Sequence, residues 1–529
     1  MMAKTSATHP LLIDEISVGG GGVLGLTLCP GKKQRFALTG EWERDLDADL
    51  RVVADWGAGA VVTLMEACEL DNFHVPNLGA AVEALGIDWY LLPIADGGVP
   101  DGGFERVWAY AGCRLRGLLA SGKRILIHCL GGLGRTGTVA ARLLIELGSS
   151  PERAIVRVRE ARPGTIETDS QERHVRNLAP IATADSLATR ILGCVLGGAI
   201  GDAFGYEVEF DSLSAIRARF GPDGIRRPVF HQGRLLVSDD TQMSLFTAEG
   251  LLRALRAEDR ATDDAVVGEI RAAYLDWLLT QGASWNGWQP RGRLARVPAL
   301  RQSRAPGNTC MSALSAGGRG TTAARINDSK GCGGVMRTAP IGLVASWDAH
   351  RAFDVGAGAA AITHGHPSGY LSGGAIAAMV RLLIGGASLE DAAGQAAELA
   401  AAWDDSDETV TAIRNALGLA RTGSQSHEGA IRSLGQGWVG EEALAIGLYA
   451  ALVGGSFVEA LAIAANHDGD SDSTASIAGQ LYGAWRAIGE IPHGWVRRID
   501  VIEPLYEIMD GLISANRLTP APAPPSQPA

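Results

Sequence analysis

The spacing of apolar residues changes once along the chain, near Leu187. Before that point, short apolar or β-branched runs alternate with stretches of helical spacing, an order that is typical of an α/β domain. After it, long Ala-, Leu- and Gly-rich stretches of helical spacing follow one another with no convincing strand between them. Because 529 residues exceed what one hydrophobic core usually holds, this change predicts two domains of different fold class.

The first domain is expected over residues 1–182, as an α/β domain with a central sheet flanked by helices, and the second over residues 187–515, as a larger all-α domain. The small and polar stretch Ile181–Ser186 separates the two. The expected strands are Val23–Leu28, Ala60–Met65, Trp89–Pro93 and Arg124–His128. The expected helices of the second domain are Thr247–Leu255, Ala265–Leu279, Gly373–Leu383, Asp391–Trp403, Glu442–Leu452 and Ser476–Ala487. The Pro-rich segment 516–529 has few apolar anchors and is expected to be a disordered tail.

Composition excludes several classes of function. A net charge of −12 disfavours a general nucleic-acid binder, which normally carries a basic stripe. The seven cysteines form no CxxC pair, and residues 1–16 lack the features of a signal peptide, so a reducing cytoplasm is expected. The most apolar stretches, around Ile191–Ile200 and Ala375–Ile384, are expected to be too short to span a bilayer. We therefore expect a cytoplasmic protein with no membrane segment.

The segment His128–Gly137 is the most specific motif of the first domain. It follows an apolar strand and precedes a helical run, so successive backbone N–H groups and the helix N-terminus are expected to point at one anion. A cysteine in that field, here Cys129, is expected to be a thiolate, and Arg135 is placed to hold two phosphate oxygens. A buried structural cysteine in a glycine-rich turn is the alternative, which Arg135 six residues later disfavours.

This motif resembles that of cysteine phosphatases with the pattern His-Cys-x5-Arg-Ser/Thr, and among them the kinase-associated dual-specificity phosphatases. The likeness runs over residues 25–182 and includes Leu26–Gly31, Val75–Leu78 and Pro93–Asp101. The resemblance implies a phosphatase in which Cys129 forms a phosphocysteine. It also implies that Asp96 is the general acid, with Asp101 as the fallback.

Further site residues follow from the same resemblance. Thr136 is expected to hydrogen-bond the thiolate sulfur, and no cofactor is expected in this domain. The phosphate-binding residues would be Leu130, Gly131, Gly132, Leu133, Gly134 and Arg135. Because the loop interior is uncharged, phosphotyrosine or another singly phosphorylated group is expected rather than a phosphoinositide.

Three acidic segments characterise the second domain: Gly201–Phe210, Ser238–Gln242 and Asp468–Ser473. Clustered carboxylates and hydroxyls without Cys or His partners are hard oxygen ligands, which suit Mg²⁺, Mn²⁺ or Ca²⁺ rather than Zn²⁺. The second segment also fits a capping box at a helix start. The third begins like an EF-hand loop, but Ser473 and Gly479 stand where that loop needs Gly and Glu.

Together with Pro306–Cys310, Asn327–Pro340 and Thr363–Pro367, these segments resemble the ADP-ribosylglycohydrolase family over residues 188–487. The resemblance implies two Mg²⁺ (or Mn²⁺) ions and a gating or catalytic carboxylate, Glu209. The implied metal ligands are Ser238, Asp239, Asp240, Asp470, Asp472 and Ser473. The implied ADP-ribose pocket contains Ser329, Gly331, Cys332, Gly333 and His364. Family members often have Asn where this chain has the cysteine.

The sequence therefore predicts a bifunctional hydrolase. One domain would hydrolyse a phosphorylated protein or a small phosphate monoester. The other would cleave, with metal, the N- or O-glycosidic bond of an ADP-ribosylated protein or a small ADP-ribosyl compound. Alternatively, one domain is a non-catalytic reader of ADP-ribose or phosphate that targets the other. The joint presence of Cys129, Arg135 and the four aspartates of the second site favours catalysis.

Overall fold

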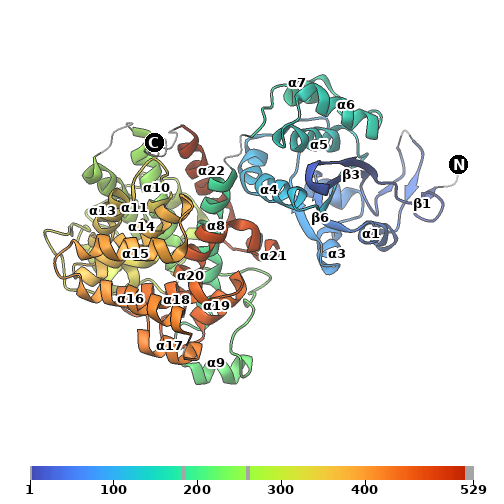
Figure 1. Cartoon of the computed structure of the whole chain (residues 1–529). Helices are drawn as coiled ribbons and strands as arrows, with labels where there is room; N and C mark the ends of the chain where they lie inside the picture. The colour runs from blue at the N-terminus through green and yellow to red at the C-terminus, as the bar shows by residue number, and fades with distance from the viewer. Residues whose placement is uncertain (1–2, 38, 182–184, 258–261, 424, 519–529) are drawn as a thin grey trace, which may run out of the picture. The chain divides into compact units, whose positions relative to one another are not determined.

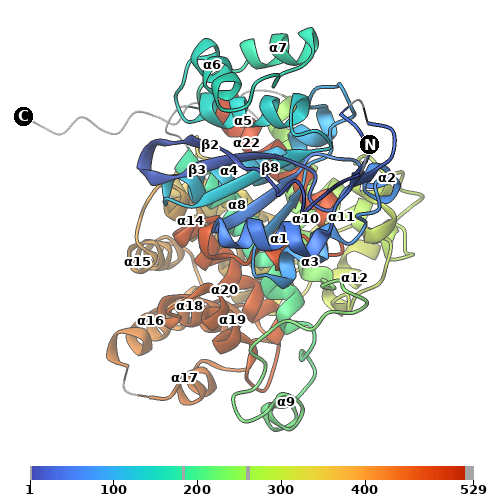
Figure 2. The ribbon, with the colours of Figure 1, turned by 90° about the vertical axis from the view of Figure 1, so that its right-hand side faces the viewer.

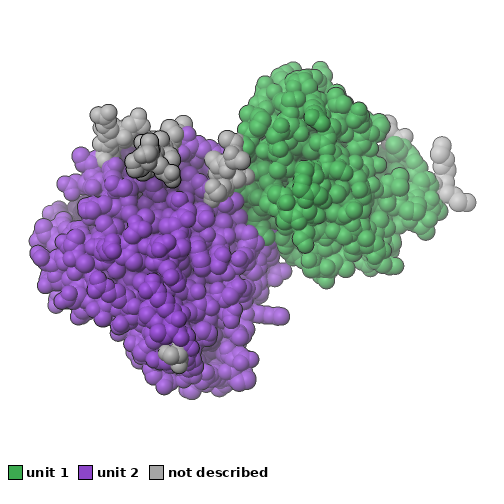
Figure 3. All heavy atoms as spheres, in the orientation of Figure 1, with its two compact units in different colours: residues 1–185 green, residues 186–529 purple. Residues whose placement is uncertain are grey.

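A computed structural model describes residues 3–37, 39–181, 185–257, 262–423 and 425–518. The chain divides into two compact units, residues 1–185 and residues 186–529 (Figure 3). This division falls within the stretch Ile181–Ser186. Of the tail expected from residue 516, residues 519–529 lie outside the described residues. Residues 516–518 differ from the expectation, because they complete a helix in which the Asn516 side chain donates to Leu343 O at 2.8 Å.

Unit 1 is built on a five-stranded sheet of order β2-β3-β8-β6-β7. Its strands are β2 (Asp14–Ser17), β3 (Val23–Leu28), β6 (Ala58–Thr63), β7 (Asp88–Leu91) and β8 (Arg124–Cys129). Strand β2 pairs antiparallel with β3, and the other pairs are parallel. A second, small sheet contains β1 (Lys4–Thr5), β5 (Trp42–Glu43) and β4 (Lys33–Gln34). All four strands predicted in this domain therefore overlap strands of the larger sheet.

Helices cover both faces of the larger sheet (Figure 2). Helices α1 (Leu46–Asp55) and α3 (Leu78–Ala84) pack on one face, where Val53, Val61 and Leu126 form part of the buried core. The other helices of unit 1 are α2 (Ala67–Asn72), α4 (Gly102–Ala120), α5 (Gly134–Glu146), α6 (Pro151–Ala161) and α7 (Asp169–Arg176). Of these, α5, α6 and α7 lie on the opposite face (Figure 2). This arrangement is the predicted α/β domain.

Unit 2 is helical, as predicted. Its helices are α8 (Asp185–Gly205), α9 (Leu213–Phe220), α10 (Asp239–Ala257), α11 (Asp263–Thr280), α12 (Asn308–Ser315), α13 (Ala349–Ala361), α14 (Pro367–Ile384), α15 (Leu389–Ala401), α16 (Asp407–Thr422), α17 (His427–Leu434), α18 (Gly440–Val453), α19 (Phe457–Ala465), α20 (Ser471–Arg486), α21 (His493–Val496) and α22 (Ile502–Leu518). Helices α18, α19 and α20 lie side by side (Figures 1 and 2). Each of the six predicted helices overlaps one of these elements.

Helices α8 and α20 approach each other unusually closely. A Cβ atom on Gly193 would lie 2.2 Å from the backbone oxygen of Gly483, and one on Gly197 would lie 2.2 Å from that of Gly479. On Gly201 it would lie 2.1 Å from the oxygen of Ala475. Because any larger side chain would force the backbones apart, these glycines fix the distance between the C-terminal half of α8 and the start of α20.

Two helices differ from the sequence expectation in length. The windows Leu187–Gly205 and Pro367–Ile384 have 19 and 18 residues and mean hydropathies of 1.4 and 1.2, enough by length and composition to cross a membrane. However, 78% and 89% of these windows are buried inside the protein. The high apolar content is therefore that of helices packed on all sides in a protein core.

Candidate active sites

The anion loop of unit 1 runs from the last residue of β8, Cys129, to the first residue of α5, Gly134. The buried Cys129 sulfur accepts a hydrogen bond from Gly132 N at 3.3 Å. Gly132 has φ +73°, and a Cβ atom there would lie 2.2 Å from Thr27 O. The tight curl of this loop therefore requires glycine at this position.

The loop is anchored by a buried lysine that the sequence analysis did not single out. Lys32 Nζ and Cys29 N both donate to Leu130 O, at 3.1 and 3.3 Å. Burial lowers the pKa of Lys32 to about 8. A positively charged group thus lies behind a loop whose own interior is uncharged. No local pattern reveals it, because Lys32 and Leu130 are 98 residues apart in sequence.

The guanidinium of Arg135 is buried and held by a carboxylate. Its two terminal nitrogens donate to the two carboxylate oxygens of Glu69, at 2.6 and 2.9 Å, and Nη1 also donates to Ile94 O at 3.0 Å. Burial opposes the charge, but the hydrogen bonds to Glu69 outweigh it, so the pKa of Arg135 is raised. Glu69 was missed because its only sequence signal is a capping box with Glu66 at the start of α2.

The predicted general acid lies at the rim of this loop. Asp96 is 79% exposed, and its Oδ1 lies 2.9 Å from Nη2 of Arg135. The fallback acid Asp101 instead caps α4 by accepting from Phe104 N at 2.8 Å. Asp96 and Arg135 are therefore together, as the resemblance implies.

Two details differ from the predicted phosphate site. The Thr136 hydroxyl is buried without a hydrogen-bond partner among the described residues, so it does not bond the Cys129 sulfur as expected. The amide of Gly134 donates to a carboxylate oxygen of Glu167 at 2.7 Å. This N–H group is therefore satisfied by a side chain of the α6–α7 connection and does not point freely into the loop.

In unit 2, a buried aspartate organises the start of α10. Asp202 on α8 accepts hydrogen bonds from Ser238 N at 2.9 Å, from Thr241 N at 3.0 Å and from the Thr241 hydroxyl. These contacts fix the first turn of α10, which contains Asp239 and Asp240. Asp202 belongs to a segment that the sequence singled out, although no role was assigned to it.

A second pair of carboxylates lies at the start of α20. Asp470 caps this helix by accepting from Ser473 N at 3.2 Å, and Asp472 Oδ1 accepts from the same amide at 2.8 Å. The Cys332 thiol donates to Asp470 Oδ2 at 2.7 Å. Burial and the nearby carboxylates of Asp470 and Asp240 raise the pKa of this thiol well above its usual range.

Both pairs face one pocket of about 1010 Å³, its open mouth included. The acidic and cysteine side chains that line it are Glu209, Asp239, Asp240, Asp470, Asp472, Cys310 and Cys332. Of the predicted metal ligands, Ser473 also lines the pocket, whereas the Ser238 hydroxyl accepts a hydrogen bond from Asp240 N at 3.2 Å. The structure thus brings five of the six predicted ligands to a single cavity.

The pocket concentrates negative charge that it does not neutralise. Burial, followed by repulsion from Asp470 and Asp239, raises the pKa of Glu209 to about 8. Burial also raises the pKa of Asp239 to about 8, and that of Asp240 and Asp472 well above the usual range. A cation placed among these groups would remove this cost.

The donor set fits a hard divalent ion. Asp240 Oδ2 and Glu209 Oε2 are buried oxygens without a hydrogen-bond partner among the described residues. Oxygen donors of this kind are the ligands that Mg²⁺ and Mn²⁺ prefer. Within the described part of the chain, no three His, Cys, Asp or Glu side chains are already drawn together as a ligand cage.

The predicted ADP-ribose residues are placed in two ways. Gly331, Cys332, Gly333 and His364 line the same pocket as the carboxylates. Ser329 does not line it, because its hydroxyl contacts Thr309 Oγ1 at 3.0 Å and accepts from Gly331 N at 3.3 Å. Burial, with a smaller effect of a nearby arginine, lowers the pKa of His364 to about 3, so this imidazole is neutral.

Two exposed aromatic residues at the same pocket were not predicted. Phe210 and Trp438 are 75% and 41% exposed, and their rings stack with centroids 6.1 Å apart and an interplanar angle of 20°. Both line the carboxylate pocket. Phe210 directly follows Glu209 in sequence, whereas nothing local marks Trp438.

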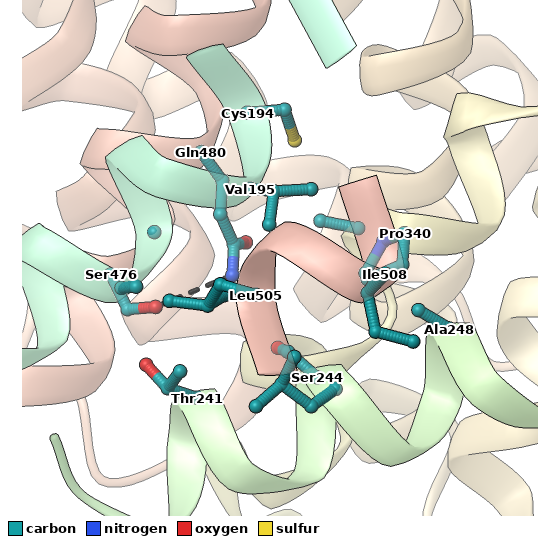
Figure 4. Close-up of a pocket in the computed structure, with 14 residues that line it drawn as sticks. Cys194, Val195, Thr241, Ser244, Ala248, Pro340, Ser476, Gln480, Leu505 and Ile508 are labelled. Carbon is teal, nitrogen blue, oxygen red and sulfur yellow. Dashed lines mark hydrogen bonds between the residues drawn. The ribbon is translucent and has the colours of Figure 1, made fainter. Parts of the chain in front are cut away.

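A second cavity lies behind α10, between α8, α20 and α22 (Figure 4). It is lined by small or apolar residues such as Val195, Ala248 and Ile508, with the amide of Gln480 and the hydroxyl of Thr241. The Gln480 amide donates to Met336 O at 2.9 Å. Because no charged side chain is among its lining residues, this cavity is a packing void rather than a candidate active site.

Comparison with known proteins agrees with both sites. The family model of ADP-ribosylglycohydrolase matches residues 183–522, and that of cyclin-dependent kinase inhibitor 3 matches residues 12–155. Cyclin-dependent kinase inhibitor 3 of Rattus norvegicus is 33% identical over 178 residues, which is 32% of this chain and 79% of that protein. ADP-ribosyl-[dinitrogen reductase] glycohydrolase of Rhodospirillum rubrum is 26% identical over 324 residues, 60% of this chain and 93% of that protein.

Among solved structures, kinase associated phosphatase with its catalytic-site cysteine replaced by serine is 32% identical. It covers 31% of this chain and 92% of that chain, with a TM-score of 0.28. These findings confirm the two resemblances noted in the sequence. The chain therefore belongs to the ADP-ribosylglycohydrolase family through residues 183–522, and residues 12–155 form a unit of the kinase-associated dual-specificity phosphatase type.

Proposed function

We propose that this protein is a bifunctional hydrolase that cleaves phosphate monoesters in unit 1 and ADP-ribosyl glycosidic bonds in unit 2. The pocket in which Glu209 meets the carboxylates of α10 and α20 is the observation that supports the second activity most strongly. The proximity of Cys129, Arg135 and Asp96 to one loop supports the first. The alternative, that one unit only reads its ligand, would require loss of one of these groups, and the chain has them all.

In unit 1, the Cys129 sulfur would attack phosphorus while the bond between phosphorus and the leaving oxygen breaks. Asp96 would give its proton to that oxygen, a role that typically accelerates such reactions ~10²–10⁴-fold. Arg135 would stabilise the charge on the transferred phosphoryl group with the guanidinium face that Glu69 orients. Water would then hydrolyse the phosphocysteine, and Asp96 would take a proton from it.

In unit 2, Asp239, Asp240, Asp470, Asp472 and the hydroxyl of Ser473 would hold two Mg²⁺ or Mn²⁺ ions. Such ions position sugar hydroxyls and lower the pKa of bound water. Ser238 would contribute mainly by fixing the backbone of Asp240, since its hydroxyl is already engaged there.

Glu209 would act on protons at the scissile bond. Its raised pKa, about 8, suits a group that must both give and accept a proton near neutral pH. Cleavage of a ribosyl bond develops positive charge at the anomeric carbon, as in glycosidases. The surrounding carboxylates would favour that charge electrostatically.

The substrates follow from the two sites in general terms. We expect an ADP-ribosylated protein or small ADP-ribosyl compound in unit 2, and a phosphorylated protein or small phosphate monoester in unit 1. The uncharged loop interior supports a singly phosphorylated group. All seven cysteines are free, which supports a cytoplasmic location.

Each activity can be removed separately in the intact chain. Cys129→Ser should abolish hydrolysis of an aryl phosphate and leave ADP-ribose release unchanged. Asp470→Ala, or a chelator, should do the reverse, and added Mg²⁺ or Mn²⁺ should restore only the chelated wild-type protein. If the Cys129→Ser protein kept substantial phosphatase activity, or if Asp470→Ala kept full glycohydrolase activity, the corresponding assignment would be wrong.

A further inference from the structure

A thiol lies among the hard oxygen ligands of unit 2. Cys332 begins a short 3-10 helix (Cys332–Arg337), and its sulfur lies 2.7 Å from Asp470 Oδ2 in the carboxylate pocket. The backbone holds the thiol in place from both sides, because Cys332 N donates to Trp438 O at 3.2 Å and Gly440 N donates to Lys330 O at 2.8 Å. The sulfur is therefore a fixed part of the pocket wall.

A second, independent group in the same pocket lacks a partner. Asp240 is 2% exposed and lines the pocket with Cys332 and Asp470, yet its Oδ2 makes no hydrogen bond among the described residues. One sulfur and two carboxylates thus face a common space. Pockets with oxygen donors alone favour Mg²⁺, whereas thiolate ligands select softer ions such as Zn²⁺.

We propose that this pocket also binds a thiophilic divalent cation of the Zn²⁺ or Cd²⁺ class, with Cys332 and Asp470 as ligands and Asp240 as the third. The proposal rests on the proposed metal pocket of unit 2 and concerns which ions that pocket accepts. On binding, the S–H bond breaks, its proton passes to solvent, and a sulfur–metal bond forms without any transfer of electrons. The soft ion would compete with Mg²⁺ and so inhibit the glycohydrolase.

The test uses the full-length, metal-free protein with Cys129→Ser in every sample, because the Cys129 thiol could also bind a soft ion. Cd²⁺ is titrated while the ultraviolet thiolate-to-cadmium charge-transfer absorption is recorded. The parent should show this band at one equivalent of thiolate. Cys332→Ser should lose it and bind Cd²⁺ at least ~10-fold more weakly. The matched control is Cys68→Ser, which removes an exposed thiol of unit 1 and should leave the band unchanged.

Mg²⁺ binding, measured by calorimetry on the same proteins, separates this inference from the proposed function. If Mg²⁺ binds but Cd²⁺ gives no thiolate band, the inference is overturned while the proposed metal site stands. If Cd²⁺ gives the band and Mg²⁺ does not bind, the inference stands and the proposed cofactor is wrong. Alkylation of the parent followed by mass spectrometry needs no variant at Cys332: Cd²⁺ should protect that cysteine, and failure to protect it would also overturn the inference.

Discussion

Glu69→Gln is the sharpest test of how the phosphate loop works. Glu69 Oε2 accepts from Arg135 Nη1 and also from Glu66 N at 2.9 Å, while Oε1 accepts from Arg135 Nη2 at 2.9 Å. A glutamine whose carbonyl oxygen occupies the Oε2 position keeps the first two bonds, and Gln serves a capping box as well as Glu does. The substitution therefore spares α2 and removes only the carboxylate charge and the bond to Nη2.

The magnitude follows from that single lost bond. Hydrogen bonds to charged groups contribute about 1.5–3 kcal/mol each. Arg135 is 2% exposed, so little solvent replaces the lost acceptor. The glutamine amide would instead place a donor against Nη2, which would turn toward Asp96 at the rim. Because ~1.4 kcal/mol corresponds to a factor of ten in rate, the expected fall in kcat/KM for an aryl phosphate is ~10–150-fold.

The assay has its control in the same polypeptide. Phosphatase kcat/KM and the inhibition constant of inorganic phosphate should both worsen by similar factors in Glu69→Gln, because the oriented guanidinium contacts both. ADP-ribose release from unit 2 should not change, which shows that the chain is folded. An unchanged kcat/KM would refute the idea that Glu69 orients Arg135, and a change in kcat/KM with an unchanged phosphate inhibition constant would restrict that role to the transition state.

Three further outcomes are expected. Gly132→Ala should reduce phosphatase turnover by ~10²-fold or more, since its Cβ would clash with Thr27 O and displace the loop; steady-state kinetics would check this. Asp202→Asn should weaken Mg²⁺ binding ~10–100-fold in calorimetry, because it loosens the first turn of α10. Since the pKa values of Glu209 and Asp239 are raised to about 8, protons compete with the ion, so Mg²⁺ affinity should rise with pH and level off above about 8. The stability of the metal-free protein should fall over the same rise in pH, because folding favours the protonated carboxyls.

The elements that the sequence predicted are those with a long, regular pattern. Strand β3 has the predicted bounds, Val23–Leu28, because a continuous apolar run fills the middle of the sheet. Strand β2 was missed, since Asp14 and Glu15 lie on an exposed edge where apolar residues are not needed. Short helices such as α9 and α17, each of 8 residues, have too few turns for apolar spacing to reveal them.

The candidate sites were predictable where their residues are neighbours in sequence. Cys129 and Arg135 belong to one loop, and the carboxylates of α10 and α20 lie in two short segments, so local motifs were enough. The groups that orient them come from distant parts of the chain. Glu69 is 66 residues from Arg135. Its contact depends on the packing of α2 beside the loop, which no pattern in the sequence encodes locally.

The helical fold of unit 2 also accounts for how so many carboxylates can share one pocket. Asp239 and Asp240 lie in the first turn of α10, and Asp470 and Asp472 lie at the start of α20, where helix N-termini favour negative charge. The close glycine contacts between α8 and α20 bring Asp202, which fixes α10, next to the start of α20. Packing of apolar helices therefore holds together groups that repel one another, and the raised pKa values reflect that repulsion. A bound cation would relieve it, which is why the same contacts that shape the core also favour a metal at its edge.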